Sequence, residues 1–473
     1  MVEVMNNPVN LVSQKQKVRH QQGFASLLFV LLIGLSLVII VLGVFITLRG
    51  LQDSAITSHA QTQAEEKSTI GVKALSNFLY SKTDAQISSI TSGTITDKNG
   101  TLTGTANSTV ATYAKSATCP TGAVTQYCFD VTASSGGASA TIRTVYQKAS
   151  TLSSTTLTGS VFAGGLVVGG SAAFTGDSSN PITILVKGGV VTDTSGKNVN
   201  STLTSGGINV GTYTATDFIT ADDLKAYSNY QFTASGATCN KLNLYSGTTK
   251  VSTTTSISCS SFSGISYSSG SWTIDPSKTL PVGVLWFDTD VVINLAAGST
   301  LVNTIVSKGS ITVNSPNSGT INNYAPYFYY STTNTDHLTL VCGTTAAANI
   351  PTQYCNSDGS FNTSSVASFP GNIANILFLT NNQLSLDAAN KAVLNYYGNI
   401  IASYGAGGTG NASGKFTGTG TINIIGNLVI AGTADTTTMQ GNITIDLSRS
   451  TASSSSVIPS YTYANGLRFM KYM

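Results

Sequence analysis

Catalysis by a nucleophile or by acid–base transfer would depend on very few residues, because the 473-residue chain contains three histidines. His20 lies in a basic stretch near the N-terminus, and His59 lies in a segment expected to be helical. His337 is therefore the histidine with which a Ser–His–Asp or Cys–His group would have to be built in the rest of the chain. It stands in a threonine-rich segment, which favours a surface loop over a general base.

Paired carboxylates are a second candidate for chemistry. Asp288 and Asp290 would share one face of a β-strand, and two neighbouring carboxylates can serve glycoside hydrolysis. Such residues are more often solvated or bound to a cation. The segment Asn356–Ser360 resembles part of a calcium loop but lacks the closing glutamate, so a turn beside a disulfide is favoured. We expect no catalytic residue, no metal site and no cofactor.

The six cysteines fall in three local pairs. An even number at short spacing is typical of disulfides in an exported protein, although sequence alone does not choose the connectivity. A zinc site is the rival interpretation, but it would need Cys-x-x-Cys or Cys/His spacings that the chain lacks. The disulfides that we favour join Cys119 to Cys128, Cys239 to Cys259 and Cys342 to Cys355.

A run of aromatic residues is the sharpest candidate for contact with a ligand. Tyrosine offers a large rigid area with a polar tip, as adhesive and carbohydrate-binding surfaces use. The alternative, which the sequence leaves equally open, is a cluster that covers one end of a β-domain. The residues of this candidate surface are Tyr324, Tyr327, Phe328, Tyr329 and Tyr330.

Composition limits the kinds of protein that can carry these residues. Charged residues are 9% of the chain and the formal net charge is +3, so the basic surface expected of a nucleic-acid-binding protein is missing. Hydrophobic residues are 41%, which argues against intrinsic disorder. The length favours two or three domains, and the abundance of Ser, Thr, Asn and Gly indicates strands and tight turns.

A membrane-spanning segment is predicted near the N-terminus. Residues 24–48 carry no charge and are long enough to cross a bilayer about 30 Å thick. Lys15, Lys17 and Arg19 precede this segment and Arg49 alone follows it closely, so the positive-inside rule keeps the N-terminus cytoplasmic. The remainder of the chain would be exported, in agreement with the cysteines.

The helix should continue beyond the membrane. Apolar residues recur at helical intervals up to Phe78 without a proline, which predicts one rod over residues 24–85. Its first half is apolar and its second half is amphipathic, a shape typical of pilins.

The N-terminal junction carries a family resemblance. The sequence Gln21-Gln22-Gly23-Phe24-Ala25-Ser26-Leu27-Leu28 follows a basic leader, and it resembles the cleavage site of type IV prepilins and pseudopilins. The pattern is most similar to PilX-type minor pilins and K-type minor pseudopilins. The resemblance implies that a prepilin peptidase cuts after Gly23 and methylates the new amino group of Phe24. Residues 1–23 would then be the prepilin leader.

Leu28 departs from the pattern of major pilins. Major pilins carry a glutamate there, at the fifth mature position, which neutralises the amino terminus of the neighbouring subunit during assembly. A subunit with leucine cannot form that ion pair in the apolar phase. The absence suits the first subunit of a filament, which has no predecessor to neutralise.

The exported region is predicted to have two β-rich parts. Residues 126–132 and 138–147 alternate apolar and polar side chains around a Ser-Ser-Gly-Gly turn, which predicts a hairpin within a pilin-type headgroup over residues 86–150. A large β-domain is expected over residues 151–450, with insertions near 217–270 and 322–372 and a C-terminal tail over 451–473. The fold class is thus α+β.

A loose repeat suggests how the large domain is built. Glycine followed by a small polar residue and aliphatic residues begins at Gly159, Gly309, Gly398, Gly426 and Gly441. Stacked coils of a β-solenoid (β-helix) would show this pattern, and we favour that fold over a β-sandwich or jelly roll.

Together these features predict a minor pilin of a type IV pilus, at or near the tip, that primes assembly and presents an adhesive β-domain. Its partners would be other major and minor pilins, the prepilin peptidase, the inner-membrane assembly machinery, the membrane before assembly, and a host, surface or DNA ligand. It would leave the inner membrane for the extracellular filament. The alternatives are a membrane-anchored surface enzyme or carbohydrate-binding protein, and a minor pseudopilin of a type II secretion system.

Overall fold

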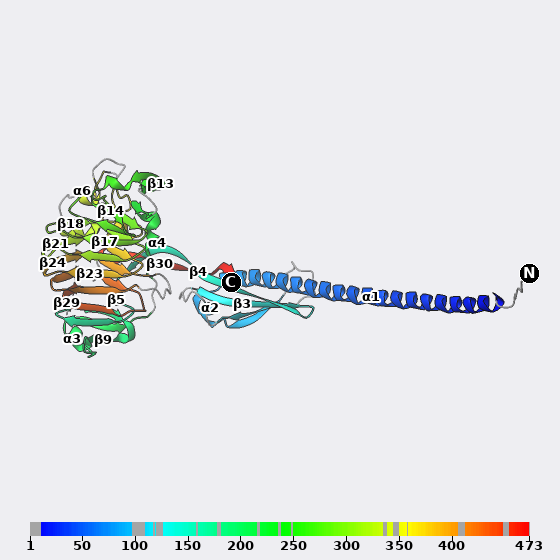
Figure 1. The fold of residues 1–473 in the computed structure, drawn as a ribbon. Helices are drawn as coiled ribbons and strands as arrows, with labels where there is room; N and C mark the ends of the chain where they lie inside the picture. Colours follow the sequence, from blue (N-terminus) through cyan, green and yellow to red (C-terminus); the bar gives the residue numbers. More distant parts are fainter. Residues whose placement is uncertain are drawn as a thin grey trace, which may run out of the picture.

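The computed structural model describes the chain except residues 1–10, 97–108, 117–118, 120–125, 158, 177–180, 215–217, 235–237, 247–248, 334–337, 344–349, 357, 405–411, 448–453 and 473. Three parts follow one another in space: a long helix, a small sheet packed against its C-terminal end, and a large β-domain beyond the sheet (Figure 1).

Helix α1 runs from Leu11 to Tyr80 over 70 residues. It begins earlier than the predicted rod and ends sooner. The end has a local cause, because Thr83 takes an extended conformation and starts a second short helix, α2 (Asp84–Ser89), through a capping box with Gln86.

The headgroup is an antiparallel sheet in the order β1-β2-β3-β4-β30. The predicted hairpin is confirmed: Ser135 pairs with Ala138 across a turn whose two glycines both have positive φ. That conformation favours glycine and matches the twist of the strands. The strands are β1 (Ser92–Thr96), β2 (Thr109–Lys115), β3 (Gln126–Ser135), β4 (Ala138–Thr156) and β30 (Val457–Tyr472).

The expectation of a C-terminal tail over 451–473 is wrong. Residues 457–472 form β30, which pairs antiparallel with β4 at the edge of the headgroup sheet. Leu467 in this strand is buried in the headgroup core. The large domain is consequently inserted between the last two strands of the headgroup rather than appended to it.

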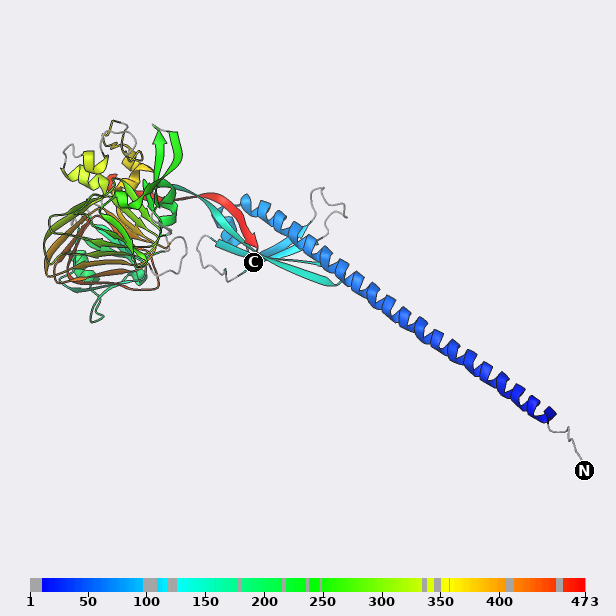
Figure 2. The ribbon, with the colours of Figure 1, turned by 45° about the horizontal axis from the view of Figure 1, so that its top comes forward.

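Parallel ladders build the large domain, and Figure 2 shows its strands wrapping around a shared interior. One sheet has the order β10-β8-β5-β28-β25-β22-β19-β16-β11-β12-β13. Its strands are β5 (Val161–Phe162), β8 (Ile182–Val186), β10 (Ile208–Thr212), β11 (Tyr230–Phe232), β12 (Thr238–Ser246), β13 (Thr249–Ser258), β16 (Val284–Phe287), β19 (Thr304–Ser307), β22 (Ile376–Thr380), β25 (Asn399–Ala402) and β28 (Leu428–Ile430).

A second path runs β14-β15-β17-β20-β23-β26-β29-β27-β24-β21-β18, with β6, β7 and β9 attached through β29 and β6. Its strands are β6 (Leu166–Gly170), β7 (Ala173–Thr175), β9 (Val191–Asp193), β14 (Ile265–Ser268), β15 (Ser271–Ile274), β17 (Asp290–Asn294), β18 (Thr300–Val302), β20 (Ile311–Asn314), β21 (Ser318–Tyr324), β23 (Leu384–Ala388), β24 (Lys391–Tyr397), β26 (Gly414–Gly418), β27 (Thr421–Ile425) and β29 (Thr437–Asp446).

The first strand of the large domain, β5, lies inside the stack and not at either end of it. β5 pairs with β8 on one side and with β28, from the end of the domain, on the other. The segment after β10 crosses to the far end of the stack, and the chain then winds back from β11 to β28. This order brings the two ends of the domain together, where Leu157 N–H donates to Ser456 O, as an insertion into the headgroup requires.

Two apolar clusters stabilise the large domain. One fills the interior between the ladders, and the other lies on the outer face of the sheet that contains β16. Short helices from the two insertions cover that outer face, in agreement with the predicted interruptions of the repeat. They are α4 (Ala221–Leu224), η2 (Lys225–Tyr227), α5 (Pro326–Thr333), α6 (Leu338–Val341), η4 (Ser365–Ala367) and η5 (Gly371–Asn375); the remaining short helices are η1 (Lys187–Gly189), α3 (Asn200–Ser205), η3 (Cys259–Ser261) and η6 (Ser454–Ser456).

Candidate functional site

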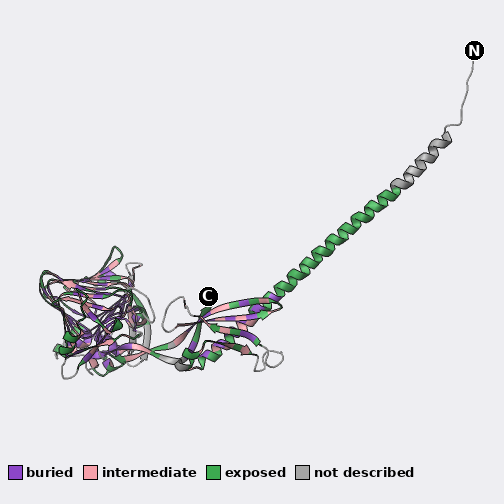
Figure 3. Ribbon diagram, turned by 90° about the horizontal axis from the view of Figure 1, so that it is seen from below, coloured by how far each residue is buried: buried purple, intermediate pink, exposed green. Residues whose placement is uncertain are grey.

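Residues 26–48 of α1, here called the bare half of the helix, form the most exposed apolar surface of the described residues. Its most apolar 18-residue window has a mean hydropathy of 3.2 and is 0% buried. Large side chains from Leu27 to Leu48 are about half to three-quarters exposed, with Ile46 at 72% (Figure 3). Water does not favour such a surface, and a helix of this length and composition is able to cross a bilayer.

The residues of the predicted cleavage junction lie within this helix. Gly23 and Phe24 are part of the α1 backbone, and the surroundings of both residues lie outside what the structure describes. Leu28 is 54% exposed, so its leucine side chain contributes to the apolar surface. Residues 1–10 of the predicted leader also lie outside the described residues.

The headgroup packs against the C-terminal part of the helix, from Ala60 to Leu79. The contact begins at the β3–β4 hairpin, where Ser135 Oγ donates to Gln63 Oε1 at 2.8 Å. Ser68 Oγ, which is buried, donates to Ala140 O at 2.8 Å. Beyond these polar contacts, Val72, Leu75 and Leu79 pack against apolar side chains of β2, β3 and β30. The face that binds the sheet therefore includes only part of the apolar pattern that predicted the rod: Leu75 is buried there, whereas Ile56 and Phe78 are exposed.

Tyr146 lies at the centre of this helix–sheet interface. Its hydroxyl donates to Val72 O and lies 3.3 Å from Ser76 Oγ, and its ring packs edge-on against Phe129. Burial raises the pKa of the Tyr146 hydroxyl, so the group remains a neutral donor.

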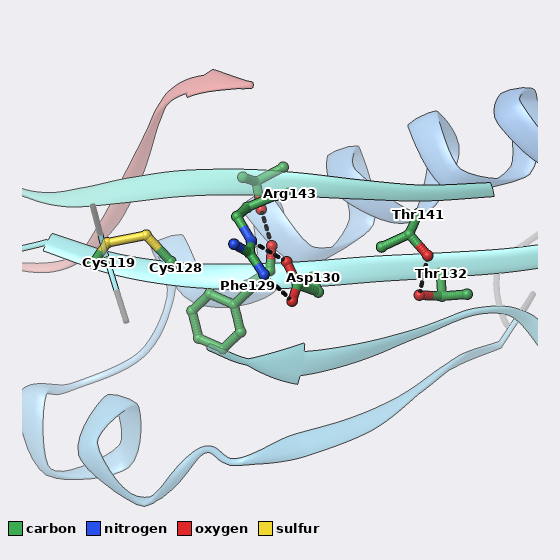
Figure 4. Close-up of polar contacts among 8 residues, drawn as sticks. Cys119, Cys128, Phe129, Asp130, Thr132, Thr141 and Arg143 are labelled. Carbon is green, nitrogen blue, oxygen red and sulfur yellow. Dashed lines mark hydrogen bonds and ion pairs between the residues drawn. A yellow bond between two sulfur atoms is a disulfide. The ribbon is translucent and has the colours of Figure 1, made fainter. Parts of the chain in front are cut away.

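An ion pair lies between β3 and β4 (Figure 4). Arg143 donates to both carboxylate oxygens of Asp130, at 2.7 and 2.9 Å. This hydrogen bonding lowers the pKa of Asp130. The pair is partly exposed, so it orders the hairpin with little net stabilisation.

The structure joins the cysteines in the three favoured pairs, Cys119–Cys128, Cys239–Cys259 and Cys342–Cys355. The first ties the start of β3 to the segment before it (Figure 4). The second closes the base of the β12–β13 hairpin, and the third lies in the insertion near 322–372, where Cys342 directly follows α6. With both sulfurs of each pair bonded to each other, these cysteines do not ligate zinc.

The two candidate carboxylates do not lie on one face of a strand. Asp288 follows β16 and Asp290 begins β17, because the chain bends between the two sheets at this point. Asp288 accepts from Ala234 N–H at 2.8 Å and Asp290 from Ser310 N–H at 2.7 Å. Each carboxylate therefore satisfies backbone donors of a bend.

The aromatic run does not form an exposed surface. Tyr324, Phe328 and Tyr329 are buried, and Tyr327 and Tyr330 stack on Phe361. This burial does not support an adhesive role for the run: Phe328 packs in the interior cluster, and Tyr324 and Tyr329 pack in the cluster on the outer face of the sheet. The run thus has a packing role, on the outer face of the sheet and in the interior rather than at one end of the β-domain.

The remaining candidates have local roles or lie outside the described residues. Asp358 accepts from the Ser360 hydroxyl and from Ser360 N–H within a turn, and these bonds, the hydroxyl's first, lower the pKa of Asp358. His337 lies outside the described residues. Among the residues that the structure describes, no group of three or more His, Cys, Asp or Glu side chains could hold a metal ion.

Sequence reasoning missed the side chains that fix the β4–β30 connection to the large domain. Asp223 accepts from the Tyr461 hydroxyl, and Asn375 Nδ2 donates to the carbonyls of Ser454 and Val457. These partners are far apart in the chain, and no local pattern marks them. These residues come together only when β30 pairs with β4.

Comparison with solved structures returned three matching chains, one of which is a pilin. The chain is similar to the crystal structure of the competence-associated pilin ComZ from Thermus thermophilus, with 11% sequence identity and a TM-score of 0.21; the match covers 88% of this chain and 97% of that chain. No family model and no curated protein matches the chain. The function has to be argued from the residues of the chain itself.

Proposed function

We propose that the protein is a minor pilin of a type IV pilus, similar to PilX-type subunits. One observation carries the proposal: residues 26–48 of a single 70-residue helix are uncharged, mostly apolar and exposed, and the C-terminal part of the same helix packs against an antiparallel headgroup. The bare half needs lipid before assembly and neighbouring helices afterwards. A helix of this kind serves both states without changing its own structure.

The large domain is proposed to be a β-solenoid. Parallel pairs connect β16, β19, β22, β25 and β28 in one sheet, and β17, β20, β23 and β26 in another. Successive strands along the chain pass in turn through these two ladders and a third one, β18-β21-β24-β27, which is how coils of a solenoid stack.

A position at the filament tip and an adhesive role complete the proposal. The large domain stands at the end of the molecule opposite to the bare helix (Figure 1), so it would project when the helix is packed in a filament. Leu28 suits a subunit that starts assembly. The ligand, whether a host molecule, another surface or DNA, would contact parts of the domain other than the buried aromatic run. The proposed work is mechanical rather than catalytic.

Processing and location follow from the same proposal. A prepilin peptidase would remove residues 1–23 and methylate Phe24 at the cytoplasmic face of the inner membrane. The assembly machinery would then transfer the subunit to the extracellular filament, where it contacts major and minor pilins.

Peptide mass analysis of sheared filaments and of membranes tests the proposal. We expect a mature chain that begins with N-methylated Phe24 in the filament fraction. A Gly23→Val variant should remain uncut, because a branched side chain hinders close approach of the peptidase to the backbone. Gly34→Val is the matched control, since a Cβ at Gly34 meets no atom within 4 Å. An uncut chain confined to membranes in the unmodified protein would contradict the proposal and indicate a permanent anchor.

A further inference from the structure

The connection between headgroup and large domain is a two-stranded ribbon formed by β4 and β30. Both strands are long, 19 and 16 residues, and each takes part in the headgroup at one end and meets the large domain at the other (Figures 1 and 2). The geometry points to a pivot within this ribbon, about which the large domain tilts relative to the helix.

The part of the ribbon next to the large domain is fixed to that domain. Ile458 is fully buried in the cluster on the outer face of the sheet. Asn372 Nδ2 donates to Ser154 Oγ at 3.0 Å, and Ser460 forms a β-bridge with Phe218. Together with the Tyr461–Asp223 hydrogen bond, these contacts attach both strands of the ribbon, so this part moves with the large domain.

The other part of the ribbon is fixed to the headgroup. β4 pairs with β3 up to Gln147, and Leu467 is 1% exposed in the headgroup core. Phe469 packs edge-on against Tyr146. Gly466 lies so close to the end of α1 that a Cβ would be 2.0 Å from Tyr80 O. This part moves with the helix.

The ladder is interrupted between the two fixed parts. Tyr463 pairs with Ser150, but the next pair is Leu467 with Lys148. Four steps along β30 therefore correspond to two steps along β4, which leaves two extra residues in β30. Extra residues leave a ladder locally unpaired and bend the strand. Two domains joined by two strands with a broken ladder are expected to change their relative angle.

Such a pivot has a mechanical consequence for a domain displayed on a surface. Both strands cross the joint, so tension between the domains is shared by two backbone segments, whereas bending meets the least resistance where the ladder is interrupted. The large domain is able to orient toward what it contacts while its connection to the helix resists extension. This inference does not depend on the protein being a pilin.

Distances between spin labels on the full chain in detergent test the pivot. One label is placed on the headgroup through Ser139→Cys and the other on the large domain through Gln440→Cys, both exposed positions. We expect a broad distribution of distances. The reference is a pair within the large domain, Asn314→Cys with Gln440→Cys, which should give a narrow one. An interdomain distribution as narrow as the reference would overturn the inference.

A deletion locates the pivot. Removing Ala464 and Asn465 gives both strands the same number of residues between the flanking pairs, so the ladder becomes continuous and the interdomain distribution should narrow. Ala464→Gly with Asn465→Gly is the matched control, which keeps the length and should keep the distribution broad. A deletion variant that retains its narrow reference distance but shows an interdomain distribution as broad as that of the unmodified protein would also overturn the inference.

Discussion

Gly466 fixes the junction between the helix and the C-terminal strand. Its φ is +91°, and the position that a Cβ would take is 2.0 Å from the carbonyl oxygen of Tyr80. Both the backbone conformation and the close approach therefore require glycine. One residue without a side chain lets β30 reach the end of α1 and place Leu467 in the headgroup core.

The matched substitution at Gly137 separates these two requirements. Gly137 has φ +86° but open space around its Cβ position. We expect Gly137→Ala to destabilise the headgroup by about 1 kcal/mol from backbone strain, and Gly466→Ala by about 2 kcal/mol more because of the added clash. Hydrogen exchange of the β4 amides measures both. Equal losses in the two variants would contradict the close contact with Tyr80.

At the scale of elements, the glycine repeat marks stacked strands. Gly398, Gly426 and Gly159 precede β25, β28 and β5, which are neighbours in one sheet. Their following polar residues form a buried chain, in which Asn399 Oδ1 accepts from Asn427 N–H and Nδ2, and Ser160 Oγ accepts from Leu428 N–H. The small polar residue of the repeat thus satisfies backbone groups where the strands begin.

A substitution of Asn399 tests this role, because the side chain is fully buried and both its oxygen and its nitrogen form hydrogen bonds. Its Nδ2 also donates to Asn375 O and Ser455 O, at 3.0 and 2.7 Å. Asn399→Ala leaves these groups without their partner and should destabilise the large domain by about 3 kcal/mol.

Denaturation followed by tryptophan fluorescence measures this loss. The two tryptophans of the chain, Trp272 and Trp286, are both buried in the large domain, so the signal reports on that domain. Asn314→Ala is the control: its Nδ2 donates to Asn294 in an exposed pair, and its removal should cost less than about 0.5 kcal/mol. Similar losses in both variants would refute the special role of the buried amide.

At the scale of the whole molecule, the headgroup is completed only after the large domain has been made. β30 supplies its last strand, and the large domain lies between β4 and β30 in the chain. Headgroup stability therefore depends on residues that are more than 300 positions from the hairpin they join. The separation along the chain does not prevent the pairing of β4 with β30, because the large domain brings its own two ends together at Leu157 and Ser456.

Removing the end of β30 tests this dependence. A chain that ends at Gly466 loses Leu467 and the pairs from Leu467 to Tyr472. We expect faster hydrogen exchange at β4 amides from Thr144 to Lys148, with tryptophan fluorescence of the large domain unchanged. The control ends at Tyr472 and should leave both signals as they are. If the longer truncation also left the β4 amides protected, β30 would be a dispensable tail.

The sequence by itself determined the features that depend on neighbouring residues. A long run of uncharged residues predicts the apolar helix over residues 24–48. The alternation of apolar and polar side chains around Gly136 and Gly137 predicts the hairpin, and the short spacing of the cysteines indicates how they pair. The physical reason is that helical periodicity, turn geometry and short-loop closure act over a few residues.

Only the tertiary structure decided the features that depend on distant residues. The pairing of β30 with β4, the burial of Tyr324 and Phe328, and the separation of Asp288 from Asp290 at a bend all follow from where the chain returns. A strand edge or an apolar face accepts any partner that matches it, so local sequence leaves the choice open. The choice is made by burial and hydrogen bonding across the completed fold, which brings together residues hundreds of positions apart.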